Sequence, residues 1–170
     1  MALPTTITHQ ARLLTVNINQ EPGITSEVLP GLHSHPLFLD PENGTWVLYV
    51  KFDPGTILPT HFHTGTVHFY TTAGTWHYLE YPEDKQVAGS YLYEPGGSIH
   101  TFCVPADATE RAEGFMVVSG ANINFGADGE FINIMDAGWI EDLLVASCKA
   151  QGRKVPRYIK PKKGARFSDA

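Results

Sequence analysis

Apolar and β-branched residues recur along this chain in short runs, and turn-forming pairs separate one run from the next. Ala73-Gly74 and Asp128-Gly129 are two of these pairs, and both lie between runs rich in β-branched and aromatic residues. Short strands at this spacing are typical of an all-β sandwich or barrel. The predicted strands cover Trp46–Phe52, Thr60–His63, Thr66–Thr72, Thr75–Tyr81, Ser90–Tyr93, Ser98–Val104, Gly114–Ser119, Ile123–Phe125 and Glu130–Ile134.

One segment near the C-terminus has helical periodicity. Trp139, Leu143 and Ala146 recur there at the spacing of successive helical turns. Asp136 precedes them as a candidate N-cap, and Gly152 follows as a stop signal. We expect this helix to cover one end of the sheet.

The strand pattern divides the chain into three parts. Residues 1–38 are expected to form an N-terminal arm, residues 39–135 the β-barrel, and residues 136–170 a C-terminal helix and tail. The tail from Arg153 to Lys163 is basic and interrupted by prolines, which predicts a solvated arm. All of this fits a single domain with one core.

Charge argues against two classes of partner. The chain carries 12 Lys and Arg against 18 Asp and Glu, for a net charge of −6, so neither nucleic acid nor an anionic membrane is expected as a partner. No segment is long and apolar enough to cross a bilayer, and a cytoplasmic protein is expected. Cys103 and Cys148 lack metal-binding or redox spacing and are expected to be buried apolar residues.

Histidine is the informative residue type. In His61-Phe62-His63, on a predicted strand, side chains two positions apart project to the same face, so two imidazoles point the same way. Such a pair offers two adjacent nitrogen ligands to a metal ion. His33 and His35 form a second pair, but His35 precedes Pro36, and we interpret that segment as a loop.

The residues around the first pair match two spaced motifs. The first has the form G-x5-H-x-H-x4-[E/H]…G and the second G-x5-P-x-G-x2-H, and they fall on Gly55, His61, His63, His68 and Gly74, then on Gly89, Pro95, Gly97 and His100. Both resemble the motifs of the cupin superfamily. The resemblance implies a double-stranded β-helix, or jelly roll. It also implies that His100, from a facing strand, joins His61 and His63 as the third ligand of one divalent transition metal.

Position 68 departs from the common cupin pattern, where a glutamate ligand is frequent. His68 is expected either to bind the metal as a fourth nitrogen ligand or to lie beside it as a hydrogen-bonding group. We expect His68, Tyr70 and Thr72 to face inward. With no carboxylate at the site, the +2 charge of the metal would be uncompensated, which favours an anionic chelating substrate.

Aromatic residues are expected to form the substrate pocket beside the metal. Tyr70 and Phe102 lie two residues from His68 and His100, and we also assign Trp76 and Tyr93 to the pocket. Apolar and aromatic walls suit a ring-bearing or short acyl substrate better than a sugar or phosphate.

Within the cupins, the run Trp46–Gly74 resembles the ChrR-like branch, and more narrowly the three-histidine iron dioxygenases that cleave 2,4'-dihydroxyacetophenone or acetylacetone. The resemblance implies a dioxygenase that uses Fe(II) and O2 to break a C–C bond next to a carbonyl in an aryl hydroxyketone or β-diketone. His68 is expected to accept the proton lost on enolisation. Imidazole ligands also suit zinc and nickel, which the purified protein is expected to carry in place of iron in some preparations.

Two other functions stay open at this point. The domain could be a non-catalytic metal-binding sensor, or an isomerase or binding protein for a small molecule on the same scaffold. A homodimer is expected by analogy with other cupins.

Overall fold

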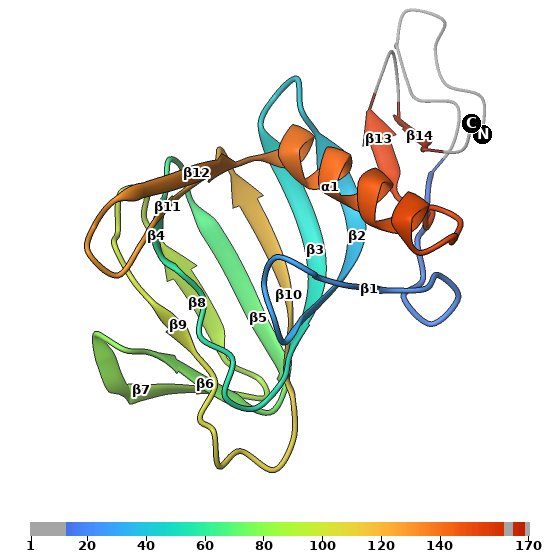
Figure 1. Cartoon of the computed structure of the whole chain (residues 1–170). Helices are drawn as coiled ribbons and strands as arrows, with labels where there is room; N and C mark the ends of the chain where they lie inside the picture. The colour runs from blue at the N-terminus through green and yellow to red at the C-terminus, as the bar shows by residue number, and fades with distance from the viewer. Residues whose placement is uncertain (1–12, 162–164, 169–170) are drawn as a thin grey trace, which may run out of the picture.

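The structure is a computed structural model that describes residues 13–161 and 165–168. Its strands form three sheets (Figure 1). The large sheet has the order β14-β13-β2-β3-β10-β5-β8, with β1 paired to β2, and the small sheets have the orders β12-β11-β4 and β7-β6-β9. The strands are β1 Ile24–Thr25, β2 Leu32–Asp40, β3 Thr45–Phe52, β4 Thr60–His63, β5 Val67–Ala73, β6 Thr75–Tyr78, β7 Tyr81–Val87, β8 Tyr91–Glu94, β9 Phe102–Cys103, β10 Ala112–Ser119, β11 Asn122–Phe125, β12 Phe131–Met135, β13 Ile159–Pro161 and β14 Ala165–Phe167.

The core fills the concave side of the large sheet. Along β3, every second side chain is buried, beginning with Trp46 and ending with Phe52, as the period of a strand requires when one face packs against a core. Along β5, Val67, Phe69 and Thr71 are the buried set. The two small sheets, one of which contains β4, close the opposite side of this core (Figure 1).

The turn between β5 and β6 depends on a glycine of the first motif. Gly74 has a φ of +69°, in the left-handed region, and a Cβ at this position would lie 2.2 Å from the carbonyl oxygen of Arg111. Only glycine fits such a turn without strain. The turn brings β6 back across the core, so that Trp76 is buried with 1% of its surface exposed.

The predicted helix is confirmed as α1, Ala137–Ala150. The side chain of Asp136 accepts a hydrogen bond from the backbone N–H of Trp139 at 2.8 Å, the N-cap arrangement that satisfies a free donor of the first turn. The helix contacts β1, β2 and β12 and so covers one end of the barrel (Figure 1). Within the part of the chain that the structure describes, no helix has the length and apolarity needed to span a membrane.

The segment before the barrel is more ordered than the sequence suggested. The stretch around His33 and His35 is not a loop: both residues lie on β2, which pairs with β3 along its length. Pro36 is accommodated there because the pairing register shifts between Pro36 and Phe38. Residues 1–12 of the predicted N-terminal arm lie outside the described residues.

The C-terminal tail is not a solvated arm throughout. Strand β13 adds to β2 in parallel, and Tyr158 just before it is 2% exposed. The Tyr158 hydroxyl and Lys160 Nζ both donate hydrogen bonds to Glu141 on α1. Lys162 and Lys163, at the end of the predicted arm, lie outside the described residues.

Candidate metal centre

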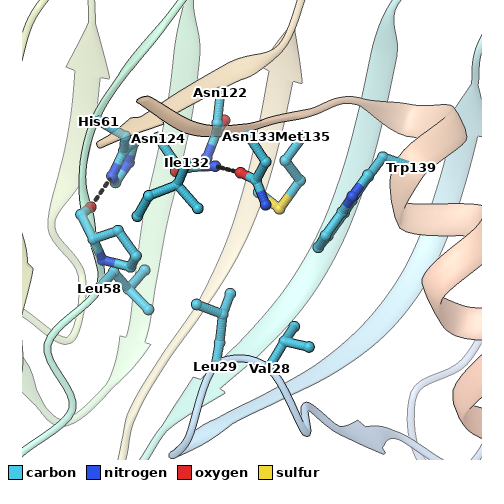
Figure 2. A pocket seen from close by; sticks show the side chains of 11 residues that line it. Val28, Leu29, Leu58, His61, Asn122, Asn124, Ile132, Asn133, Met135 and Trp139 are labelled. Atoms are coloured by element: carbon cyan, nitrogen blue, oxygen red, sulfur yellow. Dashed lines mark hydrogen bonds between the residues drawn. The ribbon is translucent and has the colours of Figure 1, made fainter. Parts of the chain in front are cut away.

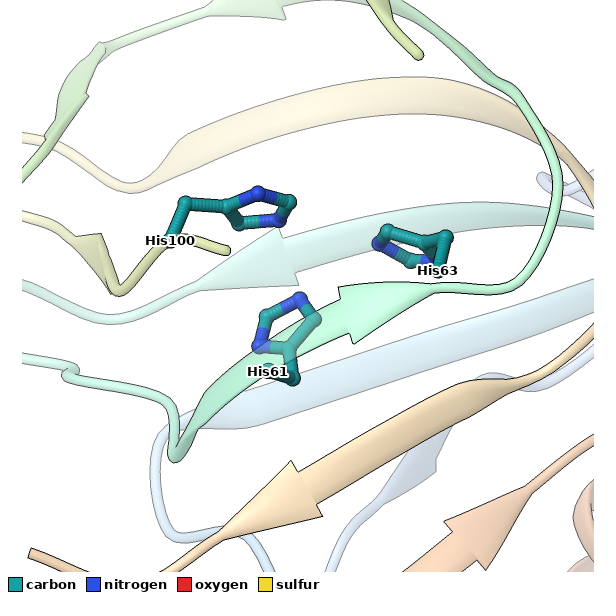
Figure 3. Close-up of side chains that lie close together, drawn as sticks. All are labelled: His61, His63 and His100. Carbon is teal, nitrogen blue, oxygen red and sulfur yellow. The ribbon is translucent and has the colours of Figure 1, made fainter. Parts of the chain in front are cut away.

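Strand β4 presents two imidazoles to the interior. His61 and His63 are 5% and 3% exposed, because alternate residues of this strand face the core. His100 is 2% exposed and lies beside them. Two backbone hydrogen bonds, His61 N to His100 O at 3.0 Å and His100 N to His61 O at 2.9 Å, hold the two chain segments in this register. The three rings converge, as Figure 3 shows.

The distances fit a common ligand set. One ring nitrogen from each of His61, His63 and His100 can be chosen so that all three atoms lie within 4.8 Å of one another. The ring centroids are 4.6 to 5.6 Å apart. Metal–nitrogen bonds to imidazole are about 2.0–2.1 Å long, so two nitrogens on one ion lie at most about 4.2 Å apart, and small movements of the rings would bring all three to an ion. The cluster could therefore hold a metal ion.

The tautomer of His61 is fixed by a hydrogen bond. Its Nδ1 lies 2.7 Å from the carbonyl oxygen of Pro59. A carbonyl only accepts, so Nδ1 carries the proton and Nε2 keeps its lone pair. Proteins usually orient a metal-binding imidazole in this way, with a hydrogen bond donated by the ring nitrogen that does not bind the metal.

All three histidines are neutral at physiological pH. Burial lowers the pKa of each, and together with the neighbouring imidazoles it brings the pKa to about 3 for His63 and about 4 for His100. Among the residues that the structure describes, none offers a hydrogen bond of good geometry to the buried Nε2 atom of His100. A buried, unprotonated nitrogen with no partner is costly unless a ligand takes its lone pair, so the donor set fits a divalent transition metal.

A carboxylate does lie at this site, contrary to the expectation from the sequence. Glu94 on β8 is 7% exposed, and its Oε2 lies 3.3 Å from Nε2 of both His63 and His100. Its Oε1 accepts a hydrogen bond from the hydroxyl of Tyr78. Burial raises the pKa of Glu94 to about 7, and the hydrogen bond from Tyr78 offsets part of this effect.

Sequence reasoning missed Glu94, although a signal was present. Residues alternate along β8, with Tyr91 and Tyr93 outward and Glu94 inward, opposite the buried Val67 of β5. Glu94 stands directly before Pro95, in a stretch whose sequence is typical of a turn.

The expected position of His68 is wrong. His68 lies on the exposed face of β5, where its Nδ1 and the hydroxyl of Tyr91 are 2.7 Å apart. It is therefore neither a metal ligand nor a neighbour of the metal. The reason is the alternation of side chains along β5. Val67 and Phe69 face the core, so the side chain at position 68 points outward.

The four residues assigned to the pocket divide into two pairs. Phe102 and Trp76 are 5% and 1% exposed and line the cavity beside the histidines. Tyr70 and Tyr93 are 47% and 52% exposed, on the outer face with His68, so their assignment to the cavity is wrong. Tyr93 instead borders a polar groove on the outer side of Glu94.

Two connected spaces lie on the inner side of the histidines, and the polar groove beside Tyr93 reaches His100 as a third space. The inner one, which we call the metal cavity, has a volume of about 80 Å³ and is lined by the three histidines and Glu94 together with apolar side chains that include Trp46, Trp76, Phe102 and Met116. The outer one, which we call the vestibule, has a volume of about 280 Å³. Its walls, shown in Figure 2, are His61, Val28, Leu29, Leu58, Pro59, Asn122, Asn124, Ile132, Asn133, Met135 and Trp139.

Solved structures with similar folds are known. A cupin-like protein of unknown function from Ralstonia eutropha JMP134 is 46% identical, with a TM-score of 0.85 over 92% of this chain and 96% of that one. An RmlC-like cupin from the same organism is 25% identical, with a TM-score of 0.77 over 85% and 92% of the two chains. An acetylacetone dioxygenase from Acinetobacter johnsonii is 16% identical, with a TM-score of 0.68 over 86% and 99%, which shows a shared fold.

Comparison with curated proteins finds no match. The sequence profile of the ChrR cupin-like domain matches residues 12–122, more than half of the chain. The matched range contains both spaced motifs, with the three histidines and Glu94. The chain therefore belongs to the ChrR cupin-like domain family, with a mostly β cupin fold and one C-terminal helix.

Proposed function

We propose that this protein is a mononuclear Fe(II) dioxygenase that cleaves the C–C bond next to a carbonyl in an aryl hydroxyketone or a β-diketone. The observation that carries the proposal is the convergence of three neutral imidazoles at the bottom of an apolar cavity. Three protein ligands leave coordination positions for a substrate, as catalytic sites require.

The walls favour a carbonyl compound over a sugar or a phosphate. Among the described residues, neither Lys nor Arg lines the metal cavity or the vestibule, so no basic side chain there would pair with a phosphate. Trp46, Trp76 and Phe102 provide flat apolar surfaces. A chelating enolate suits this setting, because it combines two oxygen ligands with an apolar body.

Bound Fe(II) would supply Lewis acidity toward the enolate and redox chemistry toward O2. The protein would supply the remaining functions. The histidines would hold the ion, the apolar walls would exclude water, and Glu94 would accept the proton that the substrate loses on enolisation. Glu94 takes the role that the sequence assigned to His68, since its Oε2 lines the metal cavity beside the histidines and a carboxylate there can accept the proton lost on enolisation. The Tyr78 hydroxyl holds the other oxygen of the carboxyl group and so fixes its orientation.

The overall reaction needs no external reductant. For a hydroxyketone, O2 adds one oxygen atom to each carbon of the C–C bond that breaks, and two carboxylic acids form. The substrate is oxidised and dioxygen is reduced in the same turnover. The fold shared with an acetylacetone dioxygenase supports this reaction class.

Oxygen uptake is the experiment that tests the proposal. Protein stripped of metal and reloaded with Fe(II) is given aryl hydroxyketones and β-diketones, with the His100→Ala variant as control. We expect stoichiometric O2 consumption and two acidic or carbonyl products from at least one class, with none from the variant. Full iron occupancy with no oxygen uptake from either class would overturn the proposal and favour a metal-binding sensor.

A further inference from the structure

We propose that the vestibule is the binding subsite for the part of the substrate that does not touch the metal, and that this part is an aromatic ring. Ile132 of β12 and Trp139 of α1 then act as specificity-determining residues. This inference rests on the proposed function, because it concerns the substrate of the same centre.

The metal cavity alone is too small for a ring-bearing ketone. Its volume of about 80 Å³ is smaller than that of an apolar cavity that holds a benzene ring, about 150 Å³. That space admits the two oxygens of a chelating group and the carbon atoms between them. A ring attached to this group must lie elsewhere. The vestibule offers about 280 Å³ between mostly apolar walls, whereas the larger groove that reaches His100 is lined by Glu83, Asp84 and Lys85 and suits an aromatic ring poorly.

The two spaces meet where the chelating group would lie. His61 and Asn122 line both of them, and so do Leu29, Leu58 and Met135. A substrate held at the histidines therefore points its remaining atoms past His61 into the vestibule (Figure 2).

The walls of the vestibule suit a flat apolar group. The indole of Trp139 and the aliphatic side chains of Leu29 and Ile132 surround it (Figure 2), and aromatic rings pack favourably against such groups. Ile132 is 48% exposed although it is a large apolar residue. A bound ring would cover part of this surface, which is a gain in burial of apolar area.

Asn122 lies at the junction between the two spaces. It is 5% exposed and lines both of them, and its side chain interacts with the imidazole of His63. A substrate that spans the two spaces therefore passes beside Asn122.

The test is binding of two diketones that share one chelating group. Nickel-loaded protein is titrated with acetylacetone, which has a methyl group on each side, and with benzoylacetone, which replaces one methyl by a phenyl ring. Calorimetry or the absorbance of the chelate measures affinity without turnover. We expect Ile132→Phe to fill part of the vestibule and to weaken benzoylacetone binding by about tenfold, because the larger side chain overpacks the space that the ring needs. Acetylacetone binding should change little.

Ile134→Phe is the matched control. Ile134 lies on the same strand, is 51% exposed, and does not line the vestibule. We expect this variant to bind both diketones as the wild type does. Nickel content is measured in all three proteins, so that a loss of metal is not mistaken for a loss of the subsite.

Three outcomes would count against the inference, and they differ in what else they overturn. If Ile132→Phe weakens both diketones equally, or neither, the ring does not lie in the vestibule, and the proposed function stands. If Ile134→Phe has the same effect as Ile132→Phe, the effect is structural and the subsite is rejected. If the nickel-loaded wild type binds neither diketone, the chelating substrate of the proposed function is wrong and the subsite falls with it.

Discussion

The inner and outer sides of the barrel carry similar residues in different environments. On the inner side, His61, His63 and His100 are buried beside Glu94. On the outer side, His68 is exposed, hydrogen-bonded to the Tyr91 hydroxyl and 5.5 Å from the ring of Tyr93. Both sets combine imidazole with aromatic or hydroxyl neighbours, and both lie on or next to strands of the same barrel.

Burial makes the difference between them. On the inner side, desolvation holds the imidazoles neutral, and several of the polar atoms lack a partner within the described structure. On the outer side, water and Tyr91 satisfy the ring of His68 without any ion. Residue type alone therefore does not mark a ligand; the face on which the residue lies does.

The largest expected difference between the faces is stabilisation by metal. Because a ligand that binds only the native state stabilises it, loading to 100 times the dissociation constant should add about 2.7 kcal/mol to the free energy of unfolding. We expect this gain in the wild type and in His68→Ala, and its loss in His63→Ala. Urea unfolding with and without metal measures it, and circular dichroism checks that His63→Ala is folded. Equal gains in His63→Ala and the wild type would contradict the assignment.

Turnover should depend on Glu94 but not on the Tyr91 hydroxyl of the outer face. Glu94→Gln keeps the shape of the side chain but cannot accept a proton, and we expect kcat to fall by about 10²–10⁴-fold, the usual contribution of a general base. Tyr91→Phe removes a hydroxyl of the outer face and should leave kcat unchanged. Steady-state oxygen uptake at matched iron content compares them. Undiminished turnover in Glu94→Gln would remove Glu94 from the mechanism.

The pH dependence of stability should separate the inner groups of the metal-free protein from one another. The folded pKa values of His63 and His100, about 3 and 4, lie below the ordinary value of 6.5, so the unfolded state binds more protons between pH 4 and 6.5. Stability should fall as the pH drops through this window, by about 1.4 kcal/mol per pH unit for each proton of difference.

Glu94 acts in the opposite direction. Its folded pKa of about 7 exceeds the ordinary 4.5, so its contribution to stability is lost as the pH rises from 4.5 to 7. Glu94→Gln should therefore give a stability that rises more steeply with pH than that of the wild type. Urea unfolding of the metal-free proteins at a series of pH values measures both slopes. Identical slopes would mean that Glu94 is not held protonated by burial.

The smallest expected effect belongs to the outer face. His68→Ala removes one exposed hydrogen bond, and we expect its free energy of unfolding to change by less than about 1 kcal/mol, as is usual for surface substitutions. Denaturant unfolding measures this change. A loss of several kcal/mol would show that the outer cluster is part of the core rather than of the surface.

The sequence predicted the positions of the three histidines well and the face of β5 poorly. His61 and His63 lie two positions apart on a strand, a spacing that places them on the same face whichever side is buried. On β5, both alternating sets contain residues that suit a core, Val67 and Phe69 in one and Tyr70 in the other, so periodicity did not decide between them. The motif position of His68 favoured the wrong set.

The other discrepancies come from prolines. Pro36 made β2 resemble a loop, and Pro95 hid the inward-facing Glu94 in an apparent turn. Both prolines are tolerated where the ladder is already irregular or ends, which depends on the tertiary register and not on the local sequence.

Metal content tests the central claim most directly. Wild type, His68→Ala and His100→Ala are stripped of metal, loaded with Fe(II) under anaerobic conditions, freed of excess ion and analysed for iron per chain. Convergence of the three buried imidazoles predicts about one iron per chain in the wild type and in His68→Ala, and almost none in His100→Ala. A wild type that retains no ion, or a His100→Ala variant that retains as much as the wild type, would contradict it.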